Sequence, residues 1–75
     1  MEVCILTQTD NAGILCVSVY KDIETCLDQV RQEFDLTGEN FTDIEKDDNI
    51  KKLSEDEYLE TPKMRYRIDI CKVNQ

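Results

Sequence analysis

Residues 22–36, DIETCLDQVRQEFDL, carry the clearest structural pattern in the chain. The apolar residues recur three or four positions apart and so share one side of a helix; they are Ile23, Cys26, Leu27, Val30 and Phe34. Asp22 is a residue type that favours the position before a helix, and Gly38 is a usual residue after its end. The stretch therefore predicts an amphipathic helix over residues 23–36.

Strand patterns stand on both sides of this helix. Residues 2–7, EVCILT, and residues 14–20, ILCVSVY, are rich in residues that favour strands, and the turn formers QTDNAG separate them. This arrangement predicts a β-hairpin with a loop of about five residues. Residues 64–73, MRYRIDICKV, alternate between apolar and polar, which predicts a final strand with one buried side.

The stretch between the helix and the final strand has a weaker pattern. Residues 39–53 contain few apolar residues and read as an acidic excursion with irregular turns. Ser54 opens the sequence SEDE, which places Glu57 where a capping box requires an acid. A short helix is therefore predicted over residues 55–60, ended by Pro62.

The predicted fold is α+β and occupies residues 1–75 as one domain. It has a three-stranded antiparallel sheet in the order 2-1-3, one long amphipathic helix on one face, and an acidic excursion with a short second helix. One helix leaves the other face of the sheet open. Either the excursion covers that face with Phe41, Ile44, Leu53 and Tyr58, or the face pairs with a second copy or a partner protein.

Charge is concentrated in one part of the chain. Residues 22–60 hold fourteen of the seventeen acidic residues and four of the nine basic ones, a net charge of −10 in a protein of net charge −8. Such a field disfavours direct binding to nucleic acid or to an anionic membrane and favours a basic partner surface. The alternative is that the charge only keeps a small protein soluble.

The cysteines do not form a recognisable metal or catalytic motif. Cys4, Cys16, Cys26 and Cys71 include no C-x-x-C pair, and the chain has no His. A negative field also disfavours the thiolate that a nucleophile requires. The sequence therefore predicts free, reduced thiols among apolar residues and neither an enzyme, a metal site nor a cofactor; a disulfide framework is the alternative.

Two charged clusters invite a ligand interpretation. Asp43, Glu45, Asp47 and Asp48 resemble the start of a calcium loop, but Asp48 stands where the loop needs Gly and Ser54 where it needs Glu. A solvated acidic loop is the preferred interpretation. A basic strip on or near the last strand either pairs with the acidic segment or binds an anion; it consists of Lys63, Arg65, Arg67 and Lys72.

The N-terminal sequence MEVCILTQTD lacks the basic start and long apolar run of a signal peptide. No segment approaches the roughly 20 apolar residues that span a bilayer. The expected location is therefore the cytoplasm of the host cell.

The opening MEVCILTQTDNAG, followed by CVSVYKD and an amphipathic helix, resembles short bacteriophage open reading frames that begin with such a hairpin. In size and charge the chain resembles the small acidic proteins of phages and other mobile elements, of the anti-CRISPR or anti-defence inhibitor type. The resemblance covers the layout and the chain as far as the first helix. It includes no catalytic motif and carries over no functional residue. It implies inhibition by binding, often at a nucleic-acid-binding surface.

These observations predict a non-enzymatic inhibitor that binds a basic, nucleic-acid-handling host complex in fixed proportion. The alternatives are a nucleotide or small-ligand sponge at an oligomer interface, and an accessory domain that forms a homodimer. The carboxylates expected to contact the partner are Asp28, Glu33, Asp35, Glu39, Asp43, Glu45, Asp47, Asp48, Glu55, Asp56 and Glu57.

Overall fold

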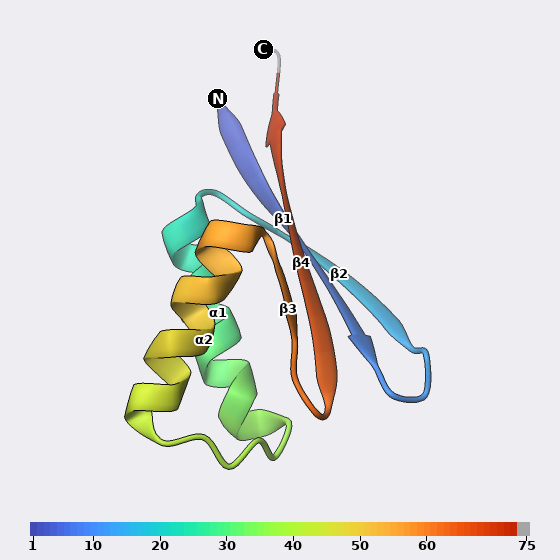
Figure 1. Ribbon diagram of the computed structural model, residues 1–75. Coiled ribbons are helices and arrows are strands. Elements are labelled where there is room, and N and C mark those ends of the chain that lie inside the picture. Colours follow the sequence, from blue (N-terminus) through green and yellow to red (C-terminus); the bar gives the residue numbers. More distant parts are fainter. Residues whose placement is uncertain (74–75) are drawn as a thin grey trace.

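The computed structural model describes residues 1–73 (Figure 1). Within them the chain forms, in order, β1 (Glu2–Asp10), β2 (Leu15–Tyr20), α1 (Ile23–Leu36), α2 (Asp43–Asp56), β3 (Tyr58–Glu60) and β4 (Met64–Lys72). The predicted α+β class is confirmed. Among the described residues, neither helix is both long and apolar enough to cross a membrane.

The four strands form one antiparallel sheet in the order β2-β1-β4-β3. The central β1 pairs with β2 on one side and with β4 on the other, so the predicted hairpin and the predicted place of the last strand are both confirmed. The predicted count of three strands was wrong, because β3 pairs with β4 and adds a fourth strand at the edge.

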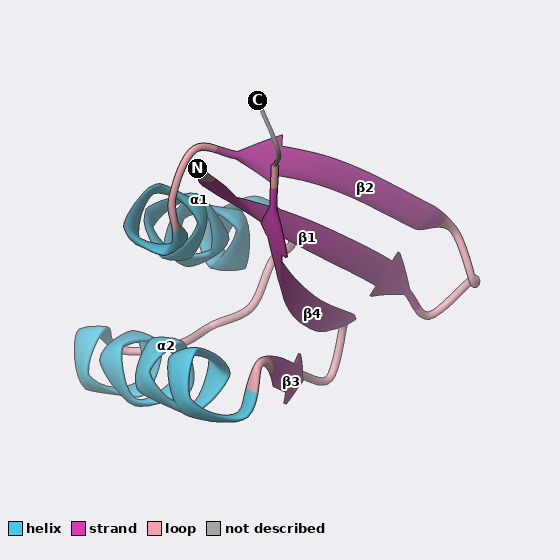
Figure 2. Ribbon diagram, turned by 90° about the horizontal axis from the view of Figure 1, so that it is seen from above, coloured by secondary structure: helices cyan, strands magenta, loops and turns pink. Residues whose placement is uncertain are grey.

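Both helices lie on the same face of the sheet (Figure 2). The first helix packs beneath β1 and β2, and the second packs beneath β3 and β4. Of the two alternatives for the far face, cover by the acidic excursion was therefore wrong: the segment joins α1 on the near face. The opposite face, called the open face below, carries no helix of the described chain.

The first helix has the predicted bounds. The carboxylate of Asp22 accepts a hydrogen bond from the backbone N–H of Thr25 at 2.7 Å, which satisfies one of the free donors at the helix start. Two residues after the helix, Gly38 has a φ of 80°, which glycine adopts without strain. The apolar stripe is buried at Cys26, Val30 and Phe34.

The second helix replaces both the irregular excursion and the short helix that the sequence predicted. Its capping box is at Thr42, whose hydroxyl accepts from the N–H of Glu45 at 3.2 Å while the Glu45 carboxylate accepts from the N–H of Thr42 at 3.0 Å. Ser54 lies inside its last turn and begins no helix. The prediction for residues 55–60 was wrong because Glu57 turns the chain into β3.

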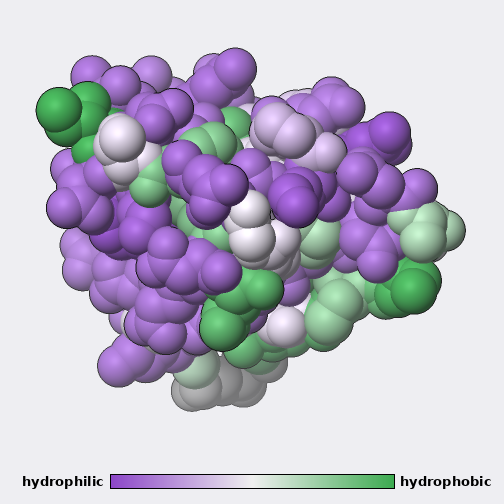
Figure 3. All heavy atoms as spheres, turned by 90° about the horizontal axis from the view of Figure 1, so that it is seen from below, coloured by the Kyte–Doolittle hydropathy of each residue, from purple (hydrophilic) through white to green (hydrophobic). Residues whose placement is uncertain are grey.

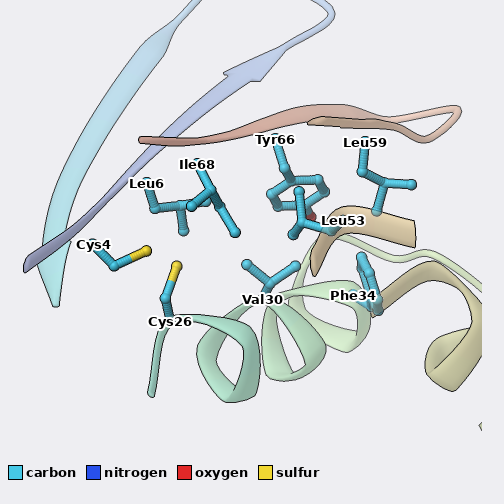
Figure 4. Close-up of a cluster of buried hydrophobic side chains, with 9 residues drawn as sticks. All are labelled: Cys4, Leu6, Cys26, Val30, Phe34, Leu53, Leu59, Tyr66 and Ile68. Carbon is cyan, nitrogen blue, oxygen red and sulfur yellow. The ribbon is translucent and has the colours of Figure 1, made fainter. Parts of the chain in front are cut away.

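The core lies between the sheet and the two helices (Figure 4). Its fully buried members come from every element except β2, whose Tyr20 packs against them; they are Cys4, Leu6, Cys26, Val30, Phe34, Leu53, Leu59, Tyr66 and Ile68. The ring of Phe34 meets those of Phe41 and Tyr66 edge to face, with centroids 5.1 Å and 5.8 Å apart. This layer fixes both helices on the sheet and leaves their outer sides to solvent.

Candidate functional site: the acidic helical layer

The outer side of the helical layer carries most of the protein's negative charge. Figure 3 shows hydrophilic residues over the side that the helices form, and hydrophobic residues gathered along the side where β2 runs. Nine of the eleven predicted partner-binding carboxylates are exposed on this layer; they are Asp28, Asp35, Asp43, Glu45, Asp47, Asp48, Glu55, Asp56 and Glu57. Glu33 is half-buried and Glu39 is buried.

Glu39 has a place inside the structure rather than on the proposed surface. Its side chain is 6% exposed, and one carboxylate oxygen accepts from the hydroxyl of Thr61 and from the backbone N–H of Lys63, each at 2.9 Å. The carboxylate thus ties the loop after α1 to the turn between β3 and β4. Its role is to hold the fold together.

Several other carboxylates have internal partners. Two ion pairs join the helices. The Nζ atom of Lys46 lies 2.8 Å from the Oδ1 atom of Asp35, and the guanidinium of Arg31 pairs with the carboxylate of Asp47. Within α1, the Glu33 carboxylate accepts from the Gln29 side chain at 3.0 Å. These contacts, together with the capping role of Glu45, account for carboxylates that the sequence alone assigned to a partner.

Six of the nine exposed carboxylates above have neither an ion pair nor a capping contact among residues 1–73; they are called the acidic outer surface below and are Asp28, Asp43, Asp48, Glu55, Asp56 and Glu57. Asp43 lies in the first turn of α2, where the helix dipole stabilises negative charge. The other members have no such structural explanation.

The acidic residues at the C-terminal end of α2 destabilise the helix. Glu55 and Asp56 occupy the last turn, where the helix dipole is itself negative, and no basic residue lies there. Glu57 follows with a φ of 58°, the left-handed conformation that glycine usually supplies. Residues and backbone conformations that lower the stability of a protein are often found at functional positions. This end of the helix is therefore the strongest part of the candidate site.

The buried thiols are poor nucleophiles, because their environment disfavours the thiolate. Cys4 of β1 and Cys26 of α1 point toward one another in the core (Figure 4). Burial raises the pKa of Cys26 to about 12 and also raises the pKa of Cys4. All four cysteines are free, as expected, but Cys16 and Cys71 are exposed rather than buried.

The open face is the second unusual surface. Leu6 and Cys4 point into the core, so the alternate residues Val3 and Ile5 lie on the open face. The register places Leu15, Val17 and Val19 of β2 on that face too, with exposed fractions of 62%, 56% and 64%. The sequence indicated a second apolar face, but the hairpin register was required to assign its residues.

The basic strip is largely neutralised on this face. The Nε atom of Arg65 lies 3.6 Å from the Oε1 atom of Glu60, and the Nε atom of Arg67 lies 3.4 Å from the Oδ2 atom of Asp69. Arg65 therefore pairs with the neighbouring strand β3 and Arg67 with its own strand β4, and neither pairs with the helical layer. The calcium-loop resemblance has no counterpart either, because α2 places Asp43 through Asp48 around a helix.

Within residues 1–73 the structure has no pocket and no group of three potential metal ligands. The candidate site is therefore described by its charge alone. Comparison with known proteins gave no match: no family model fits the chain, and no curated protein and no solved structure is significantly similar to it.

Proposed function

We propose that this protein is a non-enzymatic inhibitor whose acidic outer surface binds a basic surface of a nucleic-acid-handling protein complex. The observation that supports the proposal best is the cluster of unpaired carboxylates at the C-terminal end of α2. There Glu55, Asp56 and Glu57 cost the helix stability and have no partner among the described residues.

The mechanism is electrostatic. Opposite charges on the two surfaces accelerate encounter and fix orientation, and the complex weakens as salt screens them. A row of carboxylates on a rigid helix competes for the lysines and arginines that hold nucleic-acid phosphates. The core contact of Leu53 and the ion pairs to α1 hold that helix in place.

The biological setting follows from the resemblance of the chain. Small acidic proteins of the anti-CRISPR or anti-defence type inhibit by occupying surfaces of host complexes, and this chain has their size and charge. We therefore place the proposed partner in a host cell, as a protein that binds DNA or RNA. The nucleotide-sponge alternative gains no support, because Arg65 and Arg67 are already paired with acids.

The test compares two variants that lose the same charge. The first, Asp48→Asn with Glu55→Gln and Asp56→Asn, neutralises three of the six carboxylates of the acidic outer surface. The control, Glu2→Gln with Glu60→Gln and Asp69→Asn, neutralises three acids outside the two helices. Tagged protein is used to capture partners from nuclease-treated bacterial lysate across a salt gradient. A basic partner held by wild type and the control, but lost by the first variant, supports the proposal.

The structure also shows which variant to avoid. Neutralising Asp43, Glu45, Asp47 and Asp48 together would remove the Arg31–Asp47 ion pair and both negative charges of the first turn of α2, one of them in the capping box, along with the surface charge. A loss of binding would then reflect a loosened helix. Equal capture by wild type and by the variant at positions 48, 55 and 56 would overturn the proposal.

A further inference from the structure

We infer that two copies of this chain pair through the free edge of β2, joining their sheets into one. The inference concerns a surface separate from the acidic outer surface and does not rest on the proposed function. The two edges of the sheet, β2 and β3, differ in how they are protected.

Natural proteins protect sheet edges with short strands, charges or prolines. The β3 edge follows this rule: the strand is three residues long, contains Glu60 and is followed shortly by Pro62. The β2 edge does not follow it. Residues 14–20, ILCVSVY, contain no charge and no proline, and β2 spans six residues. The unprotected edge is suited to pairing with another strand.

The backbone groups on this edge can be assigned. The N–H of Asp10 donates to the carbonyl of Ile14 at 3.2 Å, and these residues continue the β1–β2 register as a hydrogen-bonded pair. Such pairs alternate along an antiparallel ladder. Residues Cys16, Ser18 and Tyr20 therefore bond to β1, and the intervening Leu15, Val17 and Val19 direct their N–H and C=O groups to the free edge.

This pattern is self-complementary about Val17. If Val17 of one copy faces Val17 of the other, Leu15 faces Val19 and Val19 faces Leu15. Each of these residues then offers its free N–H and C=O to a residue that offers the same. The three side chains lie on the open face in both copies, so branched apolar side chains meet across the joint. A two-fold dimer of this kind closes and forms no fibre.

Charge favours a second copy at this edge. One side of α1 lies beneath β2 and faces away from α2. Helical spacing assigns five residues to this side: Thr25, Gln29, Gln32, Glu33 and Leu36. Its only charged residue, Glu33, is half-buried and accepts a hydrogen bond from Gln29. The ion-paired residues Arg31 and Asp35 lie on the opposite flank, against α2.

Two copies of a protein of net charge −8 repel one another wherever their acidic surfaces meet. Pairing at β2 brings together the nearly uncharged sides and keeps both α2 helices at the far ends of the combined sheet. The second copy is therefore the occupant that the charge distribution fits. The acidic outer surface of each copy stays free.

The experiment measures molar mass by light scattering and sedimentation over a dilution series. We expect twice the 8.8 kDa of one chain, with little loss in high salt. Val17→Pro removes an N–H that faces the free edge and should give a monomer with an unchanged circular dichroism spectrum. Thr7→Lys is the control: it places a charge on the open face at the neighbouring strand and should leave the dimer intact.

A cross-linking variant covers the case in which Val17→Pro does not fold. In the proposed register Ser18 faces Cys16 of the second copy in a non-hydrogen-bonded pair, with Cα atoms about 4.5 Å apart. A disulfide accepts roughly 4.4–6.8 Å. With Cys71→Ser as background, Ser18→Cys should give a covalent dimer on mild oxidation, whereas Thr7→Cys should give none.

A monomeric wild-type protein over the whole dilution series would overturn the inference. So would a dimer that Thr7→Lys abolishes and Val17→Pro preserves, since that result assigns the contact to the open face. Neither result bears on the acidic outer surface, because capture of a basic partner is measured independently.

Discussion

At the scale of single residues, Glu57 is the position where stability and proposed binding conflict. It adopts a left-handed backbone conformation after the last turn of α2 and adds negative charge to a negative helix end. A side chain in this conformation costs roughly 1–2 kcal/mol relative to glycine.

We predict that Glu57→Gly raises the free energy of unfolding by about 1 kcal/mol, because glycine relieves the backbone strain and the unfavourable charge is removed. Urea titration followed by circular dichroism measures this change. The same variant should bind a basic partner more weakly than wild type. Unchanged or lower stability would mean that Glu57 is not strained as its φ indicates.

Glu39 shows the reverse case, an acid that serves the fold. We predict that Glu39→Ala lowers the free energy of unfolding by about 1–3 kcal/mol, because the N–H of Lys63 and the hydroxyl of Thr61 lose their acceptor in a buried place. Chemical denaturation gives the value. Glu24→Ala, an exposed acid of α1, is the comparison. Equal effects of the two substitutions would refute the structural role of Glu39.

The buried thiol of Cys26 and the buried hydroxyl of Tyr66 predict how the free energy of unfolding changes at alkaline pH. Burial raises the pKa of Cys26 from 9.0 to about 12 and that of Tyr66 from 10.0 to about 12. The unfolded chain therefore releases these protons at lower pH than the folded one. Stability should be complete below about pH 9 and fall steadily as pH rises toward 12. A flat unfolding free energy over that interval would contradict the burial of both groups.

At the scale of elements, the two helices differ in what their sequences could reveal. In α1 five apolar residues follow the helical period, a suitable cap precedes them and a glycine follows, so its bounds were predictable from residues 23–36. In α2 only Leu53 is buried, and the weak helix formers Asp47, Asp48 and Asn49 interrupt its middle. The capping box at Thr42 was the signal that could have located it.

The strand β3 had no such signal. It contains three residues, and its only buried one, Leu59, cannot define a period. It forms because β4 offers a free edge and the chain leaving α2 must run back past it. Pairing across the sheet, which a local pattern does not record, therefore determined this element.

Leu53 is the one fully buried residue of α2, and its substitution therefore tests how the helix docks. We predict that Leu53→Ala lowers the free energy of unfolding by about 2–5 kcal/mol, because it leaves a cavity where the helix meets β3 and β4. Ile44→Ala, in the same helix but 74% exposed, should change it by less than about 0.5 kcal/mol. Thermal and urea unfolding compare the two; similar losses would show that α2 does not dock through Leu53.

At the scale of the whole molecule, the fold separates two kinds of surface. The helical layer carries the excess negative charge, and the β2 side and open face are apolar or internally neutral. The net charge of residues 22–60 was visible in the sequence, but its division into paired and unpaired carboxylates was not. That division depends on the antiparallel packing of α1 and α2, which brings Arg31 to Asp47 and Lys46 to Asp35.

The unpaired carboxylates of α2 are the groups that we propose to bind a basic protein. The most direct test is capture from nuclease-treated bacterial lysate with wild type, the variant neutralised at positions 48, 55 and 56, and the control neutralised at positions 2, 60 and 69. We predict that wild type and the control retain one basic nucleic-acid-binding protein, that rising salt or added DNA releases it, and that the first variant does not retain it. Equal retention by all three, or binding that salt and DNA leave unchanged, would show that these carboxylates do not hold a basic partner.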